Sequence, residues 1–216
     1  MNNNSHEIPP IHNLKYACVK MYEEELQKEQ GDRDMQKFEE KTLKTEEIFS
    51  GKIINLQVQD VELPNGKTSK REIIKHPGAV AVLAITEDGN VVLVEQYRKP
   101  MEKSLIEIPA GKLEGNEDPQ EAALRELEEE TGYACKNIEL ITSFYTAPGF
   151  ADELIHLYIA TDLKKLENPK SADEDEFVEL IEVSLQKASE WIKSGKICDA
   201  KTLIAIQYWQ LQSSER

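Results

Sequence analysis

Short runs of apolar or alternating residues, separated by turn signals, predict a chain rich in β-strands. Strand signals begin at Thr42, and the turn Pro64-Asn65-Gly66-Lys67 predicts a hairpin. The predicted strands cover residues 53–61, 69–75, 79–85, 91–96, 106–108, 138–144, 154–160 and 177–183. The alternation in this set favours sheets with at least one buried face.

Helical spacing of apolar residues predicts helices at 119–130, 185–194 and 201–212. Strands on both sides of the first helix, with two more helices at the end, indicate a mixed α/β sandwich. We expect Trp191, Tyr208 and Trp209 to lie in the core or in a dimer contact.

The first 34 residues differ from the rest, because they are polar, rich in Glu and Lys, and only weakly helical in pattern. We interpret residues 1–34 as a poorly ordered tail, with a functional arm as the alternative. Met35 is a possible second translation start. The expected organisation is this tail, an N-terminal β module at 35–77 and a main domain at 78–216.

Charge and composition narrow the function. The 216 residues carry a formal net charge of −15, which disfavours binding to nucleic acid or anionic lipid. No apolar run approaches the roughly 18–20 residues of a membrane span, and no signal-peptide pattern opens the sequence. Three dispersed cysteines indicate neither a zinc cluster nor a disulfide framework. We therefore expect a cytoplasmic protein without a nucleic-acid or membrane partner.

The helix predicted at 119–130 has clear boundaries. Asp118 is a suitable N-cap, Pro119 fits the first turn, and Glu121 completes a capping box. Gly132 suits the position after the last turn. Leu124 and Leu127 are expected to anchor the helix in the core.

Three glutamates on this helix carry the candidate chemistry. Glu126, Glu129 and Glu130 have i, i+3, i+4 spacing and therefore share one face. Their mutual repulsion gives a purely structural helix no advantage, whereas a hard cation such as Mg²⁺ would turn it into coordination. A solvated acidic face is the alternative that the spacing alone leaves open.

The segment from Gly111 to Tyr133 resembles the Nudix box, with the pattern G-x5-E-x7-R-E-U-x-E-E-x-G-U, where U is bulky and apolar. The residues at the required positions are Gly111, Glu117, Arg125, Glu126, Leu127, Glu129, Glu130 and Gly132. Tyr133 departs mildly from the aliphatic residue that is more common at the last position. The resemblance implies the Nudix fold, a mixed β-sheet sandwiched between α-helices, and hydrolysis of a nucleoside diphosphate linked to another group.

The same resemblance implies a cofactor and roles for particular residues. It implies Mg²⁺, with Mn²⁺ as the alternative, bound mainly by Glu126 and Glu130, with help from Glu129 and from the carbonyl of Ala110. Arg125 would orient the glutamates, and Glu117 would support the loop. A loop at residues 171–177 would supply the catalytic base, and the sequence does not choose between its two candidates, Glu174 and Glu176.

A narrower resemblance, to bacterial ADP-ribose pyrophosphatases, runs from about Met35 onward. Its residues include Gln96–Pro100, Glu107–Gly111 and Pro148. It implies cleavage of ADP-ribose to AMP and ribose 5-phosphate. The alternatives are GDP-mannose or another nucleoside diphosphate sugar as substrate, or a domain that binds ADP-ribose without cleaving it.

This branch of the family also implies substrate contacts and a homodimer. Arg98 would contact the pyrophosphate, or else form a surface salt bridge. Glu107 would bind a ribose or base edge, or else lie on a solvated strand face. Arg71 would act in the partner's site, through a swapped β module. Further candidates for the substrate side are His76, Gly111, Pro148 and Gly149. His76 could equally be a packed loop residue, and residues 146–150 an ordinary turn.

Overall fold

The computed structural model describes residues 37–170 and 177–214. The tail at 1–34, Met35 and the two base candidates Glu174 and Glu176 lie outside the described residues. The chain divides into two compact units. The first runs to Lys44 and includes Asp60–Lys70, and the second holds Thr45–Gln59 and the chain from Arg71.

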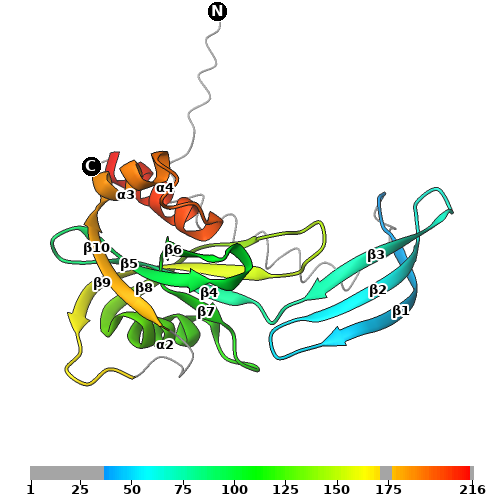
Figure 1. Ribbon diagram of the computed structural model, residues 1–216, viewed down its shortest axis with the longest axis horizontal. Helices are drawn as coiled ribbons and strands as arrows, with labels where there is room; N and C mark the ends of the chain where they lie inside the picture. Colours follow the sequence, from blue (N-terminus) through cyan, green and yellow to red (C-terminus); the bar gives the residue numbers. More distant parts are fainter. Residues whose placement is uncertain (1–36, 171–176, 215–216) are drawn as a thin grey trace, which may run out of the picture. The chain divides into compact units, whose positions relative to one another are not determined.

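Three strands form a sheet of their own in the order β1-β2-β3 (Figure 1). The strands are β1 (Lys41–Ser50), β2 (Asn55–Glu62) and β3 (Thr68–Lys75). The predicted hairpin turn between β2 and β3 is confirmed, since the amide of Leu63 donates to the carbonyl of Lys67 at 2.7 Å. Gly66 adopts a positive φ of 77°, a conformation that favours glycine in such a turn.

A second, mixed sheet has the order β10-β5-β4-β9-β8, with β6 added to β5 and β7 added to β4. In this sheet β4 runs parallel to β9, while β5 pairs antiparallel with both β4 and β10. Its strands are β4 (Ala79–Ile85), β5 (Asn90–Arg98), β6 (Lys103–Glu107), β7 (Ala110–Lys112), β8 (Tyr133–Tyr145), β9 (Leu154–Lys165) and β10 (Val178–Ser184). A short 3₁₀ turn, η1 (Lys99–Met101), joins β5 to β6.

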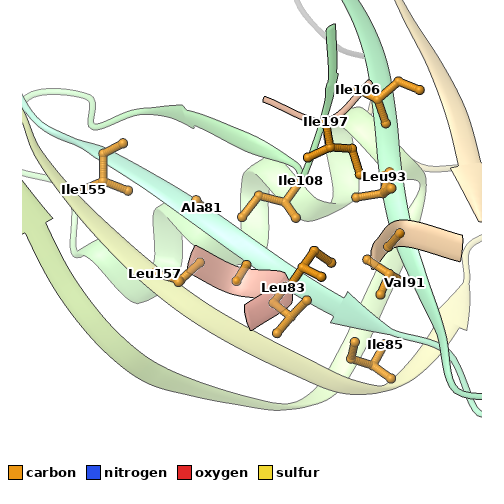
Figure 2. Packing of buried hydrophobic residues seen from close by; sticks show 13 residues of the cluster. Ala81, Leu83, Ile85, Val91, Leu93, Ile106, Ile108, Ile155, Leu157 and Ile197 are labelled. Atoms are coloured by element: carbon orange, nitrogen blue, oxygen red, sulfur yellow. The ribbon is translucent and has the colours of Figure 1, made fainter. Parts of the chain in front are cut away.

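Helices cover both faces of this second sheet: α2 (Pro119–Thr131) lies on one, and α3 (Leu185–Lys193) and α4 (Ala200–Ser214) lie on the other (Figure 1). The alternation along β4 explains the arrangement. Val80, Val82 and Ala84 belong to the apolar cluster that includes α2. Ala81, Leu83 and Ile85 belong to the opposite cluster, to which α3 and α4 contribute (Figure 2). The predicted mixed sheet sandwiched between helices is confirmed.

The structure corrects one detail of the predicted core. Leu127 is fully buried, as expected, but Leu124 is 37% exposed, so the expectation that it anchors α2 is wrong. At about 100° per residue, Leu124 lies some 60° away from Leu127, at the edge of the buried face. That face is occupied instead by Ala122 and Ala123, which are fully buried.

The aromatic residues of α3 and α4 lie against the core, which is one of the two places expected for them. Trp191, Tyr208 and Trp209 are partly buried against the core cluster beneath α3 and α4. No helix in the described part of the chain is long and apolar enough to cross a membrane.

Candidate active site

Local sequence signals fix the helix that carries the three glutamates. The Asp118 carboxylate accepts hydrogen bonds from the amides of Gln120 and Glu121, at 2.8 and 3.3 Å, and Pro119 begins the first turn. Gly132 ends the helix with a φ of 67° and donates its amide to the carbonyl of Glu128. Both predicted caps of α2 are therefore confirmed.

Arg125 connects the acidic residues of α2 with the loop that precedes the helix. Its Nη1 donates to Glu126 Oε1 at 2.7 Å and to Glu129 Oε2 at 3.0 Å. Its Nε and Nη2 donate to the two oxygens of Glu117 at 3.0 and 2.9 Å. Hydrogen bonds from Arg125 lower the pKa of Glu117, and the same contacts raise the pKa of Arg125. One guanidinium therefore holds three carboxylates together.

The short strand β7 lies against the two buried glutamates of α2. Glu126 and Glu130 are each only 6% exposed. Glu130 Oε2 accepts the amide of Ala110 at 2.9 Å. A Cβ atom placed on Gly111 would lie 2.0 Å from the carboxylate of Glu126, so only glycine leaves room for that group. The backbone of β7 thus positions both carboxylates.

The glutamates of α2 have the type of donor atom that a hard divalent cation requires. Their carboxylate oxygens are the ligands that Mg²⁺ and Mn²⁺ prefer. In the structure Arg125 binds oxygens of Glu126 and Glu129, and a cation would compete with it for them. Within residues 37–170 and 177–214, no three His, Cys, Asp or Glu side chains are already arranged so that they could hold a metal ion. The absence of a side chain at Gly111 leaves room in the fold for the carboxylate of Glu126.

A cavity of about 430 Å³ borders this region, within the second compact unit. Its lining comes from the beginning of β4, the ends of β5 and β6, all of β7, and the beginning of α4. The residues Ala110, Gly111 and Lys112 line the cavity, and the first two also contact the glutamates of α2. The same three-residue strand therefore borders both the cavity and the acidic helix.

One side of the cavity is formed by four charged residues, Arg98, Glu107, Asp199 and Lys201, which we call the charged wall. Arg98 donates Nε and Nη2 to the two oxygens of Glu107, both at 2.8 Å. Lys201 also binds Glu107, and it binds Asp199 Oδ1 at 3.0 Å. With only 2% exposure, Glu107 is not on a solvated strand face, so that reading is excluded.

The buried carboxylate of Glu107 stays ionised because of its partners. Burial alone would raise its pKa, but the hydrogen bonds from Arg98 and the positive charge of Lys201 hold the pKa below its ordinary value. The contacts with Glu107 likewise raise the pKa of Arg98. Arg98 and Glu107 are therefore held as an ion pair within the wall.

His76, Thr146 and Glu153 also line the cavity. The Thr146 hydroxyl donates to Glu153 Oε2 at 2.5 Å, and Glu153 Oε1 lies 3.7 Å from His76 Nε2. His76 Nδ1 accepts the amide of Gly78 at 3.1 Å, which fixes the ring. A carboxylate with a neutral hydroxyl partner thus faces the same cavity as the charged wall.

Comparison with known proteins identifies the family. Residues 75–203 match the Nudix domain, and residues 40–74 match the nucleoside diphosphate sugar hydrolase N-terminal domain. The chain belongs to the Nudix family of hydrolases. The segment from Gly111 to Tyr133 lies inside the matched Nudix domain.

Individual relatives agree with this assignment. The chain is 65% identical over 177 residues to a methanol dehydrogenase activator of Bacillus methanolicus, covering 82% of this chain and 96% of the relative. It is 58% identical over 180 residues to an ADP-ribose pyrophosphatase of Bacillus subtilis, covering 83% and 97%. A crystal structure of an ADP compounds hydrolase has a similar fold, with a TM-score of 0.73 at 20% identity, covering 85% of this chain and 98% of that one.

The Nudix domain brings some of the predicted site residues together and leaves others apart. His76, Arg98, Glu107, Ala110 and Gly111 all line the cavity. The helix residues Glu126 and Glu130 are not among the lining residues but contact β7, which is. Three substrate-side candidates, Arg71, Pro148 and Gly149, are not among the lining residues.

Among the cavity residues that the sequence pattern did not indicate are Glu153, Asp199 and Lys201. Asp199 could have been found as a helix cap, because Asp is a preferred N-cap residue and directly precedes α4. In the structure its Oδ1 accepts the amide of Thr202 at 3.0 Å. The contact between Lys201 and Glu107 joins residues 94 positions apart, so no local pattern could have revealed it.

Proposed function

We propose that this Nudix hydrolase cleaves the pyrophosphate bond of ADP-ribose, giving AMP and ribose 5-phosphate, with Mg²⁺ as the metal. The observation that carries the proposal is the shared strand, because Ala110 and Gly111 line the cavity and also contact Glu130 and Glu126. A substrate in the cavity would therefore lie next to the acidic helix. The relative named ADP-ribose pyrophosphatase, at 58% identity, supports the choice of substrate.

Each group has a definite task in this proposal. Glu126, Glu129 and Glu130, with the carbonyl of Ala110, would hold Mg²⁺, or Mn²⁺ in its place. A bound divalent cation supplies charge neutralisation at the pyrophosphate and an activated water. Arg125 keeps Glu126 and Glu129 side by side before the cation binds. Arg98, which also lines the cavity, would use the N–H groups that do not bind Glu107 to bind phosphate oxygens.

The substrate assignment can be tested by steady-state hydrolysis of a panel containing ADP-ribose, GDP-mannose and other nucleoside diphosphate sugars, with Mg²⁺ and with EDTA. We expect the highest kcat/KM for ADP-ribose, and loss of turnover without metal. Glu130→Gln should lower kcat/KM by at least about 100-fold, because a ligand carboxylate is lost. The exposed variant Glu190→Gln serves as the matched control.

Other outcomes would change the proposal in different ways. A higher kcat/KM for GDP-mannose would keep the mechanism and overturn the substrate. Binding of ADP-ribose without turnover in the presence of Mg²⁺ would favour the non-catalytic alternative.

Glu153 joins Glu174 and Glu176 as a candidate for the general base. Among the carboxylates of the cavity, Glu107 and Asp199 both bind Lys201, whereas Glu153 accepts a hydrogen bond from the Thr146 hydroxyl. A carboxylate that is not paired with a lysine or arginine is better placed to take a proton from water.

We expect Glu153→Gln to lower kcat by roughly 10²–10⁴-fold, the usual contribution of a general base. Glu174→Gln and Glu176→Gln are the matched comparisons, and affinity for Mg²⁺, measured by titration, should change little in all three variants. If a loop variant loses kcat while Glu153→Gln retains it, the base belongs to the loop.

We further propose that the active form is a homodimer that works in the cytoplasm. All ten residues of β1 are exposed, and Leu43, Ile48 and Phe49 are among the exposed large hydrophobic residues. An apolar surface of this kind marks an interface. The dimer would use the module at 35–77, with Arg71 acting in the partner's site, beside a main domain at 78–216 and a tail at 1–34. Among the described residues, the free cysteines Cys135 and Cys198 suit a reducing compartment.

A further inference from the structure

The charged wall joins three parts of the fold through one lysine. Lys201, in the first turn of α4, is only 12% exposed in its side chain. Its ammonium binds Glu107, from β6, and Asp199, from the loop before α4. Glu107 in turn binds the guanidinium of Arg98, from β5, through both of its oxygens. The position of Arg98 therefore depends on a carboxylate that Lys201 also holds.

The two carboxylate oxygens of Asp199 differ in their hydrogen bonding. Its Oδ1 accepts the amide of Thr202 and the ammonium of Lys201, both at 3.0 Å. Its Oδ2 is buried and, within residues 37–170 and 177–214, accepts no hydrogen bond. Since capping α4 needs only one neutral acceptor, the charge of Asp199 is more than the helix requires.

The four side chains of the wall sum to zero charge, because two cations face two carboxylates. An anion entering the cavity meets this wall, and partly buried charges interact strongly over a few ångströms. A change of one unit in the wall should therefore alter the affinity for a pyrophosphate group.

We infer that Lys201 and Asp199 together set the charge of the cavity wall that an anionic substrate meets, with Lys201 favouring the anion and Asp199 opposing it. The inference rests on the proposed function only for the identity of the substrate. Affinity for a simple anion tests it independently.

The test is a charge cycle on the full-length protein, with inorganic pyrophosphate as the probe. Lys201→Met keeps the length of the side chain and makes the wall negative. Asp199→Asn keeps an oxygen for Lys201 and Thr202 and makes the wall positive. The double variant is neutral again. Isothermal titration calorimetry at low ionic strength gives the Kd of pyrophosphate for each form.

We expect Lys201→Met to weaken pyrophosphate binding by about three- to tenfold, and Asp199→Asn to strengthen it by a similar factor. The double variant should return to near the wild-type Kd. The KM for ADP-ribose should follow the same order. Lys187→Met and Glu190→Gln, which alter an exposed pair on α3 by the same unit charges, should leave the Kd unchanged.

Several results would overturn the inference. A merely structural role predicts that both single variants bind more weakly, that the double variant is weakest, and that melting temperatures fall in parallel. Equal Kd values in all forms, or no binding to the wild type, would also reject it. If the cycle has the expected order but ADP-ribose is not hydrolysed, the inference stands and the proposed substrate fails.

Discussion

A missing side chain is as important to this site as the carboxylates themselves. Gly111 has no positive φ, so a turn conformation does not explain glycine at this position. Space explains it, because the carboxylate of Glu126 occupies the volume that a Cβ atom would need. Arg125 holds that carboxylate from its other side at 2.7 Å. Gly111 therefore sets the position of a proposed metal ligand.

Replacing Gly111 with alanine should displace Glu126 and leave the fold intact. The clashing atoms belong to the end of a side chain, so the backbone need not move. We expect the Mg²⁺ concentration for half-maximal activity to rise by about 10–100-fold, as when a residue supporting a metal ligand is lost. The melting temperature, measured by calorimetry, should fall by only a few degrees.

Gly51→Ala is the matched control for that substitution. Its Cβ would lie 2.6 Å from the ring of Phe49, which belongs to β1 and not to the acidic helix. The Mg²⁺ dependence of Gly51→Ala should equal that of the wild type. An unchanged Mg²⁺ dependence in Gly111→Ala would mean that Glu126 does not bind the metal.

Helices and strands with a strong local sequence signal were predicted well. A strand that forms only by pairing with a distant strand was not. The apolar run of β4 was placed at 79–85, as observed, and α2 was predicted within one residue. The sequence pattern does not separate β1 from β2, and β7 has no signal in it. The three residues of β7 pair with Ala79, Val80 and Ala81 of β4, and tertiary pairing of this kind leaves no periodicity to read.

The cap of α2 allows a prediction about stability. Asp118→Ala removes the acceptor for the amides of Gln120 and Glu121, so the free energy of unfolding should fall by about 1 kcal/mol. Asp118→Asn, which keeps an oxygen in place, should cost much less. Urea denaturation followed by circular dichroism measures both. Equal losses in the two variants would show that charge, and not capping, stabilises the helix.

For the whole molecule, the sequence could predict the layers but not the complete site. The mixed sheet between helices followed from strand alternation and the Nudix box, and Leu127 is buried as expected. The charged wall was only half predicted, because Arg98 and Glu107 each belong to a segment that resembles the family, whereas Lys201 reaches the wall from α4 and Asp199 from the loop before it. Contacts of this range depend on the folded chain and have no local signature.

The dimer proposal predicts that two inactive variants restore each other when mixed. Arg71→Ala removes a group proposed to act in the partner's site, whereas Glu130→Gln removes a metal ligand in its own site. In a mixed dimer, one site therefore combines an intact Glu130 with an intact Arg71 from the other chain, and the second site lacks both. Equal amounts, unfolded and refolded together, should recover about one quarter of the wild-type activity, because half of the dimers are mixed and each has one working site.

The samples refolded separately and then combined in the assay provide the background. Recovery no greater than that background would place Arg71 in the site of its own chain, and light scattering that gives a monomer mass for the wild type would reject the dimer itself.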